Sequence, residues 1–261
     1  MTFPDNWQLP EFLLFEFSPK KSKYAICVFT LNEGEKFKEQ IREMVQIADD
    51  FDILIADGGS SDDSTNSDFL SQNRINSLIV KTGEGRLSAQ MRMAFAIALM
   101  RGYQGIITVD GNHKDETRAA HLFADALDNG VDHIQGSRFI PGGHGINTPL
   151  VRHWAIRLLH APIISIASGY HYTDTTNGFR GYSARFLLDK KVAPFRDIFS
   201  TYELHYYLSI RAPRLGYKVT EIPVTRRYPG KGKVPTKISP IKGNLLILKI
   251  LFTAAFGGYN P

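Results

Sequence analysis

The chain has few of the features that mark secreted or membrane-spanning proteins. Its one cysteine, Cys27, excludes a disulfide within the chain and favours a reducing compartment. No apolar run reaches the roughly 20 residues of a helix that spans a bilayer. No basic segment precedes the N-terminal apolar part, and Glu11 and Glu16 interrupt it, so no secretory signal peptide is expected. Internal repeats, low-complexity tracts and a clear interdomain linker are also absent.

Length and charge narrow the class further. The 261 residues are 43% hydrophobic and 22% charged, which fits one large α/β domain or two closely joined ones. The net charge of +5 favours an anionic partner, which is a phosphate-rich ligand, a nucleic acid or a membrane surface. Because the basic residues are not interleaved with aromatic ones, nucleic acid is not an expected partner.

Apolar runs alternate with helical patterns in the first half of the chain. Buried strands are predicted at 24–30, 52–56, 77–80 and 105–109, and helical spacing at 37–48, 87–100 and 119–127. This alternation predicts a parallel sheet with right-handed crossovers. The second half is mixed, with a strand at 131–138, a loop at 141–145, helical segments around 149–168, a turn and edge strand at 174–183, a helix at 201–215 and a last strand at 217–224.

An acidic motif ends one predicted strand. Asp110-Gly111-Asn112 follows the apolar run 105–109, at the edge where open α/β sheets bind ligands. An oxygen ligand fixed there can hold a hard divalent cation, and the cation can hold a diphosphate. The alternative is a loop aspartate that caps the following helix. Asp115 has the same two interpretations, and the helix cap is favoured.

Several short motifs occur in an order that resembles a known family. They are Asn32-Glu33, Asp57-Gly58-Gly59-Ser60, Asp110-Gly111-Asn112, Asn177-Gly178-Phe179-Arg180, Glu203-Leu204, Leu215-Gly216-Tyr217 and Glu221-Ile222-Pro223-Val224. Together they resemble the inverting family-two glycosyltransferases with the GT-A fold, especially the dolichol- and polyprenyl-phosphate sugar transferases. The match departs from the family at the Pro and Tyr expected before Asn32, at Asn112 in place of an Asp, and at Glu203, which lacks the usual neighbouring Asp.

The resemblance implies the architecture. The fold is expected to be α/β of the GT-A type, a Rossmann-like, mostly parallel sheet flanked by helices, with a mixed acceptor-side half. Residues 1–22 are expected to form a strap and 23–243 the glycosyltransferase domain, divided into a nucleotide-binding half (23–130) and an acceptor-side half (131–243). Residues 244–261 are expected to form an apolar helix and tail.

The resemblance also implies donor-site residues. Those at the nucleotide are Thr30, Asn32, Glu33, Asp57, Gly58 and Arg86, although Arg86 has a solvated loop charge as its alternative. Asp110 and Asn112 would hold Mg²⁺ or Mn²⁺; since Asn112 removes one negative ligand, diphosphate oxygens and water would complete the metal shell. A basic stretch after the last strand contains Arg226, Arg227, Lys231, Lys233, Lys237 and Lys242. It either closes over donor and acceptor phosphates, as the resemblance implies for Lys233 and Lys237, or is a solvated loop.

The general base has two candidates. Inverting transfer to a hydroxyl needs a base beside the attacking oxygen, and Glu203 and Asp174 are the carboxylates proposed for it. Each has a buried structural carboxylate as its alternative. A phosphate acceptor, already anionic at pH 7, needs no base.

The function implied is a nucleotide-sugar-dependent inverting glycosyltransferase that moves a sugar from a nucleoside-diphosphate sugar to a lipid-linked or cell-surface glycan acceptor. The cation or basic side chains would neutralise the departing diphosphate. One alternative is a non-catalytic nucleotide- or glycan-binding protein on the same fold. Another is a sugar nucleotidyltransferase, which is disfavoured because Gly83-Glu84-Gly85-Arg86 does not follow the first strand.

The apolar stretch 245–252 is too short to span a bilayer. It is expected either to be a buried terminal helix or to contact a membrane surface or a second copy of the chain through 244–256. The expected location is the cytoplasm, with peripheral contact at the inner face of the membrane.

Overall fold

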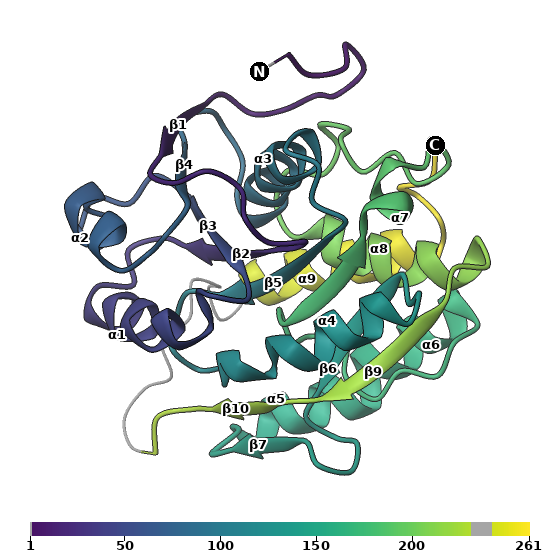
Figure 1. Cartoon of the computed structure of the whole chain (residues 1–261). Helices are drawn as coiled ribbons and strands as arrows, with labels where there is room; N and C mark the ends of the chain where they lie inside the picture. The colour runs from purple at the N-terminus through teal and green to yellow at the C-terminus, as the bar shows by residue number, and fades with distance from the viewer. Residues whose placement is uncertain (1, 231–241) are drawn as a thin grey trace.

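The protein is built on a central sheet covered by helices on both faces (Figure 1). The structure, a computed structural model, describes residues 2–230 and 242–261. Eight strands hydrogen-bond in the order β1-β4-β3-β2-β5-β8-β6-β9. Their bounds are β1 Phe12–Glu16, β2 Tyr24–Thr30, β3 Asp52–Asp57, β4 Ser77–Lys81, β5 Gly105–Asp110, β6 His133–Ser137, β8 Arg180–Ser183 and β9 Val219–Pro223.

The first half of the sheet is parallel from β4 to β5, as the alternating pattern predicts. Strand β2 is buried along its whole length because its side chains enter two cores. Ala25, Cys27 and Phe29 face one core, whereas Ile26 and Val28 face the other. Since β2 lies between β3 and β5, the chain order reverses beside it, and such a switch point is where open α/β sheets bind ligands.

The second half of the sheet is mixed. Strand β8 runs antiparallel to both β5 and β6, and β9 is parallel to β6. The prediction of an edge strand at 174–183 is therefore wrong, because β8 has a hydrogen-bonded strand on each side. Its neighbours come from distant parts of the chain, which a local pattern does not reveal.

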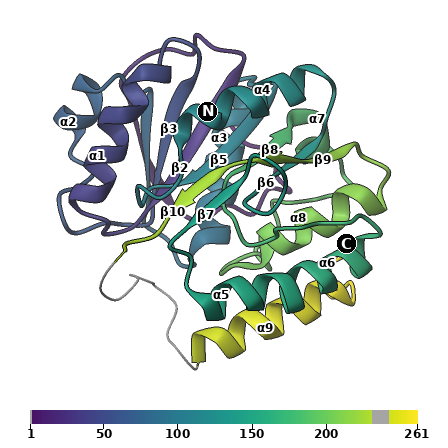
Figure 2. The same cartoon turned by 90° about the horizontal axis from the view of Figure 1, so that it is seen from below.

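The helices form two layers, seen edge-on in Figure 2. Helices α1 and α4 pack in one core, and α3, α6, α8 and α9 pack in the other. The helices are α1 Glu35–Met44, η1 Val45–Ile47, α2 Ser67–Gln72, α3 Leu87–Met100, η2 Thr117–Ala119, α4 Ala120–Asp128, α5 Leu150–Ala155, η3 Ile156–His160, α6 Ala161–Ser168, α7 Ala184–Leu188, α8 Glu203–Arg214 and α9 Lys242–Ala255. None of the helices in the described ranges has the length and apolarity needed to cross a membrane.

Two features lie outside the predicted elements. Within 1–22, β1 pairs antiparallel with β4 at the sheet edge, and the ring of Trp7 stacks on that of Phe195 with their centroids 3.9 Å apart. The predicted loop at 141–145 contributes instead to a small parallel pair of β7 (His144–Ile146) and β10 (Thr225–Arg227). This pair matters for function, because β10 carries Arg226 to the end of β5.

Candidate functional site

The ends of three central strands form the floor of the candidate site. Thr30 ends β2 and pairs with Asp57 at the end of β3, and Phe29 pairs with Asp110 at the end of β5. The amide Nε2 of Gln90 on α3 donates to the carbonyl oxygens of Thr30 at 2.9 Å and Ala56 at 3.1 Å. The predicted donor residues of β2, β3 and β5 therefore meet at one edge of the sheet.

Hydrogen bonds connect the loops after β2 and β3, and the side chains that make them belong to the predicted motifs. Asp57 is 1% exposed and accepts from Ser60 through the backbone N–H at 3.0 Å and the hydroxyl at 2.6 Å. Ser60 Oγ in turn accepts from the Asn32 N–H at 2.9 Å, and Asn32 Oδ1 accepts from the Ser61 N–H at 2.8 Å. Asn32, Asp57 and the adjoining Gly58 thus form one rigid corner of the site.

The remaining donor candidates lie around this corner. Thr30 is 3% exposed, and its hydroxyl has no hydrogen-bond partner among the described residues. Glu33 is half-buried, whereas Arg86 is exposed and its N–H donates to the Ser200 carbonyl at 2.6 Å. A cavity of about 610 Å³ adjoins Arg86, between the N-terminal strap and Thr201, and Asp110 does not line it. Arg86 therefore lines this cavity, and its carbonyl accepts from the N–H of Gln90, whose side chain contacts the ends of β2 and β3.

Asp110 and Asp115 share one arginine. Arg226 Nη2 lies 2.9 Å from Asp110 Oδ2, and its Nη1 donates to Asp115 Oδ2. Burial alone would lower the pKa of Arg226, but the two carboxylates raise it, so the guanidinium stays charged. The favoured prediction that Asp115 caps a helix is wrong: Glu116 precedes η2 and the cap has no side-chain hydrogen bond. Asp115 is instead a buried partner of Arg226.

The motif Asn177-Gly178-Phe179-Arg180 supports Asp110 from the side. A Cβ atom at Gly178 would lie 2.5 Å from Asp110 Oδ1, so only glycine leaves room for this carboxylate. The Thr108 hydroxyl fixes Gly178 by donating to its carbonyl at 2.8 Å. Asn177 Oδ1 accepts from the Phe179 N–H at 3.0 Å. The motif therefore positions the acidic end of β5.

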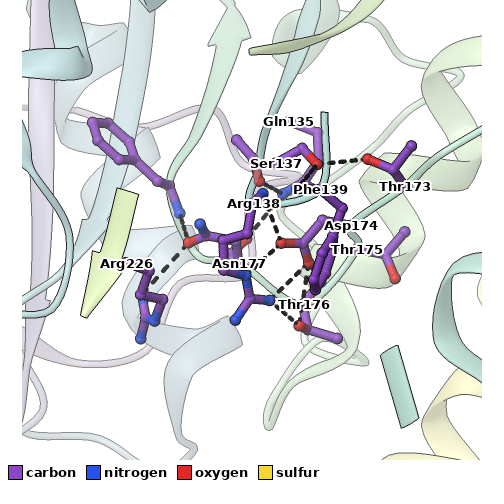
Figure 3. Close-up of polar contacts among 12 residues, drawn as sticks. Gln135, Ser137, Arg138, Phe139, Thr173, Asp174, Thr175, Thr176, Asn177 and Arg226 are labelled. Carbon is purple, nitrogen blue, oxygen red and sulfur yellow. Dashed lines mark hydrogen bonds and ion pairs between the residues drawn. The ribbon is translucent and has the colours of Figure 1, made fainter. Parts of the chain in front are cut away.

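Asp174, a candidate base, is fully buried in an ion pair (Figure 3). Arg138 contacts it through Nε at 2.6 Å and Nη2 at 2.9 Å. Burial raises the pKa of Asp174, but Arg138 and backbone N–H groups lower it below its ordinary value. Glu221 braces this segment by accepting from the N–H groups of Thr173 and Asp174, and burial raises the pKa of Glu221 to about 7. These contacts favour the structural alternative for Asp174.

Glu203, the other candidate base, begins α8 and is 7% exposed. Its carboxylate accepts from the N–H of Thr201 at 2.6 Å and from the Thr201 hydroxyl. Glu203 lies beside the cavity at Arg86, because Thr201 lines that cavity. Its oxygens are engaged in fixing the start of α8, a contact that the sequence did not indicate.

Cations gather around Tyr228, and of these the sequence had indicated only Arg226, as part of the basic stretch. Arg138 Nη1 and Arg152 Nη1 lie 2.9 and 3.4 Å from the Tyr228 hydroxyl, and Lys114 and Arg226 lie within 6 Å of its ring. We call Lys114, Arg138, Arg152 and Arg226 the cationic cluster. Arg138 ends the predicted strand 131–138 in a polar Gly136-Ser137-Arg138, which was the available signal. Lys233 and Lys237 lie outside the described residues.

The oxygen atoms available to a metal at the end of β5 are those of Asp110 and Asn112. Across residues 2–230 and 242–261, no three His, Cys, Asp or Glu side chains gather as a metal site. Asn112 Oδ1 is buried and has no hydrogen-bond partner there, and the Asp110 side chain is 27% exposed. A carboxylate and an amide oxygen are the chemistry that Mg²⁺ or Mn²⁺ accepts when its other ligands come from a diphosphate and water.

Comparison with solved structures identifies the fold. No protein-family model matches the chain. A glucosyl-3-phosphoglycerate synthase from Mycobacterium tuberculosis, in complex with Mn²⁺, UDP and glucosyl-3-phosphoglycerate, is similar with a TM-score of 0.60 and 11% identity, over 90% of this chain and 78% of that chain. The same enzyme with phosphoglyceric acid has a TM-score of 0.63 and 12% identity, over 89% and 80% of the two chains. The predicted GT-A fold is confirmed.

Curated relatives indicate the kind of enzyme. Glycosyltransferase AglJ of Haloferax volcanii is 25% identical, over 87% of this chain and 71% of the relative. Polyprenol monophosphomannose synthase of Mycolicibacterium smegmatis is 29% identical, over 77% and 76%. Undecaprenyl-phosphate mannosyltransferase of Micrococcus luteus is 28% identical, over 75% and 80%. The chain is a glycosyltransferase, and the predicted resemblance to polyprenyl-phosphate sugar transferases is confirmed.

Proposed function

We propose that this glycosyltransferase moves a hexose from a nucleoside-diphosphate sugar to a polyprenyl phosphate, by direct displacement with inversion. The observation that carries the proposal is the cationic cluster, which lies between the acidic end of β5 and an exposed apolar face. The names of the curated relatives support a polyprenyl-phosphate acceptor. A likeness to complexes that hold UDP and Mn²⁺ supports the donor and the metal.

The donor side follows from the corner at Asn32 and Asp57. Thr30, Glu33 and Arg86 would contact the nucleotide around it, with Asp57 and Gly58 near the base. Mg²⁺ or Mn²⁺ held by Asp110 and Asn112 would neutralise charge that grows on the departing diphosphate. The chain adds fixed cations of its own, because Lys114 is half-buried and Arg226 is buried at this point. Fixed charges need no reorganisation during transfer.

The acceptor side follows from an apolar face on α5, η3, α6 and α9, and α5, α6 and α9 lie side by side (Figure 2). The term apolar face refers here to a set of exposed hydrophobic side chains. They are Leu150, Val151, Trp154, Leu158, Ile166, Leu245, Phe252 and Phe256. Single exposed apolar residues are ordinary, but a gathered set marks an interaction surface. Exposed Arg157, Lys242 and Lys249 accompany it, a pattern typical of helices that lie on anionic membranes.

Arg152 joins the apolar face to the site. It belongs to α5, between exposed Val151 and Trp154, and its guanidinium carbon lies 5.5 Å from the Tyr228 ring centroid. A lipid phosphate whose chain rests on the apolar face would therefore meet a cation at the entrance. Such a phosphate is already an anionic nucleophile, so Glu203 and Asp174 need not take a proton.

Transfer from radiolabelled UDP- and GDP-hexoses to a polyprenyl phosphate in anionic vesicles tests the proposal. We expect a lipid-soluble labelled product, lost in Asp110→Ala and reduced in Arg152→Gln. Transfer to a soluble glycan but not to polyprenyl phosphate contradicts the proposed acceptor. Nucleotide binding with no transfer or donor hydrolysis supports the non-catalytic alternative.

Membrane contact is tested separately by vesicle sedimentation. We expect Leu158→Glu to weaken binding to anionic vesicles, since it places a charge in the apolar face. Leu122→Glu on α4 is the matched control, because Leu122 is also exposed but belongs to another helix. If the wild-type protein dimerises and does not bind vesicles, and Leu158→Glu abolishes the dimer, the apolar face is assigned to a second copy of the chain.

A further inference from the structure

One side-chain cation already spans the two carboxylates at the end of β5. Arg226 is 6% exposed and contacts both Asp110 and Asp115. Its position is fixed by the backbone: β10 pairs with β7, with Arg226 opposite Gly145, and an isolated bridge joins Arg226 to Asp115. A buried arginine on a paired strand is part of the folded site, unlike a surface side chain that drifts over a carboxylate.

This arginine neutralises the site before any ligand arrives. A guanidinium stays protonated at all physiological pH values, so the positive charge beside Asp110 is permanent. Half-buried Lys114 adds a second cation whose charge interacts with both Asp110 and Arg226. A divalent cation that approaches Asp110 alone therefore meets a carboxylate that is already paired and two like charges beside it.

Oxygen atoms suited to a cation remain next to this pair. Asn112 Oδ1 and Asp115 Oδ1 are buried and have no hydrogen-bond partner in the described part of the chain. Asp115 is 4% exposed. A buried carboxylate oxygen without a partner is rare, and its lone pairs can accept a cation. The local chemistry thus allows a metal, while Arg226 opposes it.

We propose that Arg226 is a resident counter-ion that keeps divalent metal from the Asp110 site until the nucleotide diphosphate is bound, so that metal and nucleotide bind as one unit. The proposal rests on the donor chemistry of the proposed function. A diphosphate supplies negative charge for both cations and oxygen ligands for the metal. With the diphosphate bound, Arg226 would share its N–H groups between a phosphate and the Asp115 carboxylate, and Asp110 would become available to hold the metal.

Direct Mn²⁺ binding without nucleotide, measured by electron paramagnetic resonance and calorimetry, tests the proposal. We expect no measurable binding to the wild-type protein, and Mn²⁺ binding to Arg226→Gln that is tighter by on the order of tenfold or more, since a unit charge beside the ligand is removed. Arg226→Lys keeps the charge and should behave as wild type. Arg227→Gln is the matched control, because Arg227 is an exposed neighbour on the same strand.

The design covers loss of folding. Arg226→Gln leaves the buried Asp115 carboxylate without its partner, so Arg226→Gln/Asp115→Asn, which removes both charges, is measured in parallel with circular dichroism. A folded double variant that binds Mn²⁺ alone supports the proposal. Wild-type protein that binds Mn²⁺ as tightly as the variants overturns it, as does a folded Arg226→Gln single variant that gains no Mn²⁺ binding.

Failure here is distinguishable from failure of the proposed function. Wild-type transfer that continues in EDTA shows that transfer needs no divalent metal. That result overturns the counter-ion proposal but leaves the proposed glycosyl transfer intact. Conversely, absence of transfer to any polyprenyl phosphate contradicts the proposed function, yet the difference in Mn²⁺ binding between wild type and Arg226→Gln still tests the counter-ion.

Discussion

Gly178→Ala is expected to disable transfer while leaving the fold intact. The added methyl group would lie 2.5 Å from Asp110 Oδ1 and 3.0 Å from its Cγ. To reach an ordinary contact of 3.4 Å, the carboxylate must move by roughly 0.9 Å. A misplacement of about 1 Å in a reacting site can lower the rate about 100-fold, so we expect kcat to fall by that order. The unfolding free energy should change little, because Asp110 is a short side chain at a partly exposed edge.

The assay measures kcat at saturating donor together with the thermal midpoint. Gly130→Ala is the control: nothing lies within 4 Å of its added Cβ, but the backbone φ of +74° strains an L-residue. That variant should lose about 1 kcal/mol of stability and keep wild-type kcat at low temperature. If Gly178→Ala retains wild-type kcat, the position of Asp110 does not matter and the reasoning about the end of β5 is refuted.

Three further predictions concern the buried titratable groups. Glu203→Gln should lower kcat less than about tenfold, because an anionic acceptor needs no base; a loss nearer to 10³ would restore Glu203 as the base. Asp174→Asn should reduce the unfolding free energy by roughly 3–5 kcal/mol in urea titrations, since it leaves buried Arg138 unpaired; inactivity at full stability would argue against this structural role. Burial lowers the pKa of His133 to about 3, so the unfolded chain binds a proton that the folded chain does not, and stability should fall by about 1.4 kcal/mol per pH unit as pH drops from 6.5. His133→Phe should remove that part of the slope between pH 7 and 4.5, and an unchanged slope would count against it.

Much of the first half was predictable because its elements are defined by local pattern. Strand β2 and helix α3 were predicted with the bounds observed, since β2 is buried throughout and α3 almost throughout. Strand β1 was missed because it alternates exposed and half-buried residues at the sheet edge and depends on β4 for its pairing. The position of β8 was wrong because its partners are set by topology.

The predictable parts of the site are those that follow from the order of strands and motifs along the chain. The motif at Asp110 follows a recognisable strand, so its place at the sheet edge was open to inference. Arg226 is separated from Asp110 by 116 residues, and no spacing rule joins them. Their contact depends on β7 pairing with β10, and both strands have only three residues. The same holds for Tyr228, where α5, β6 and the chain after β10 meet.

The N-terminal strand has a consequence for synthesis and aggregation. Strand β1 covers the outer side of β4, with Phe12 opposite Lys81 and Glu16 opposite Ser77. Because the ribosome makes β1 before β4, β1 must stay unpaired at least until β4 has been translated. Until it docks, the unpaired edge of β4 can template addition of a foreign strand. Strand β1 thus closes this edge only after β4 has formed, and deleting 1–17 should yield protein that self-associates through the exposed edge of β4.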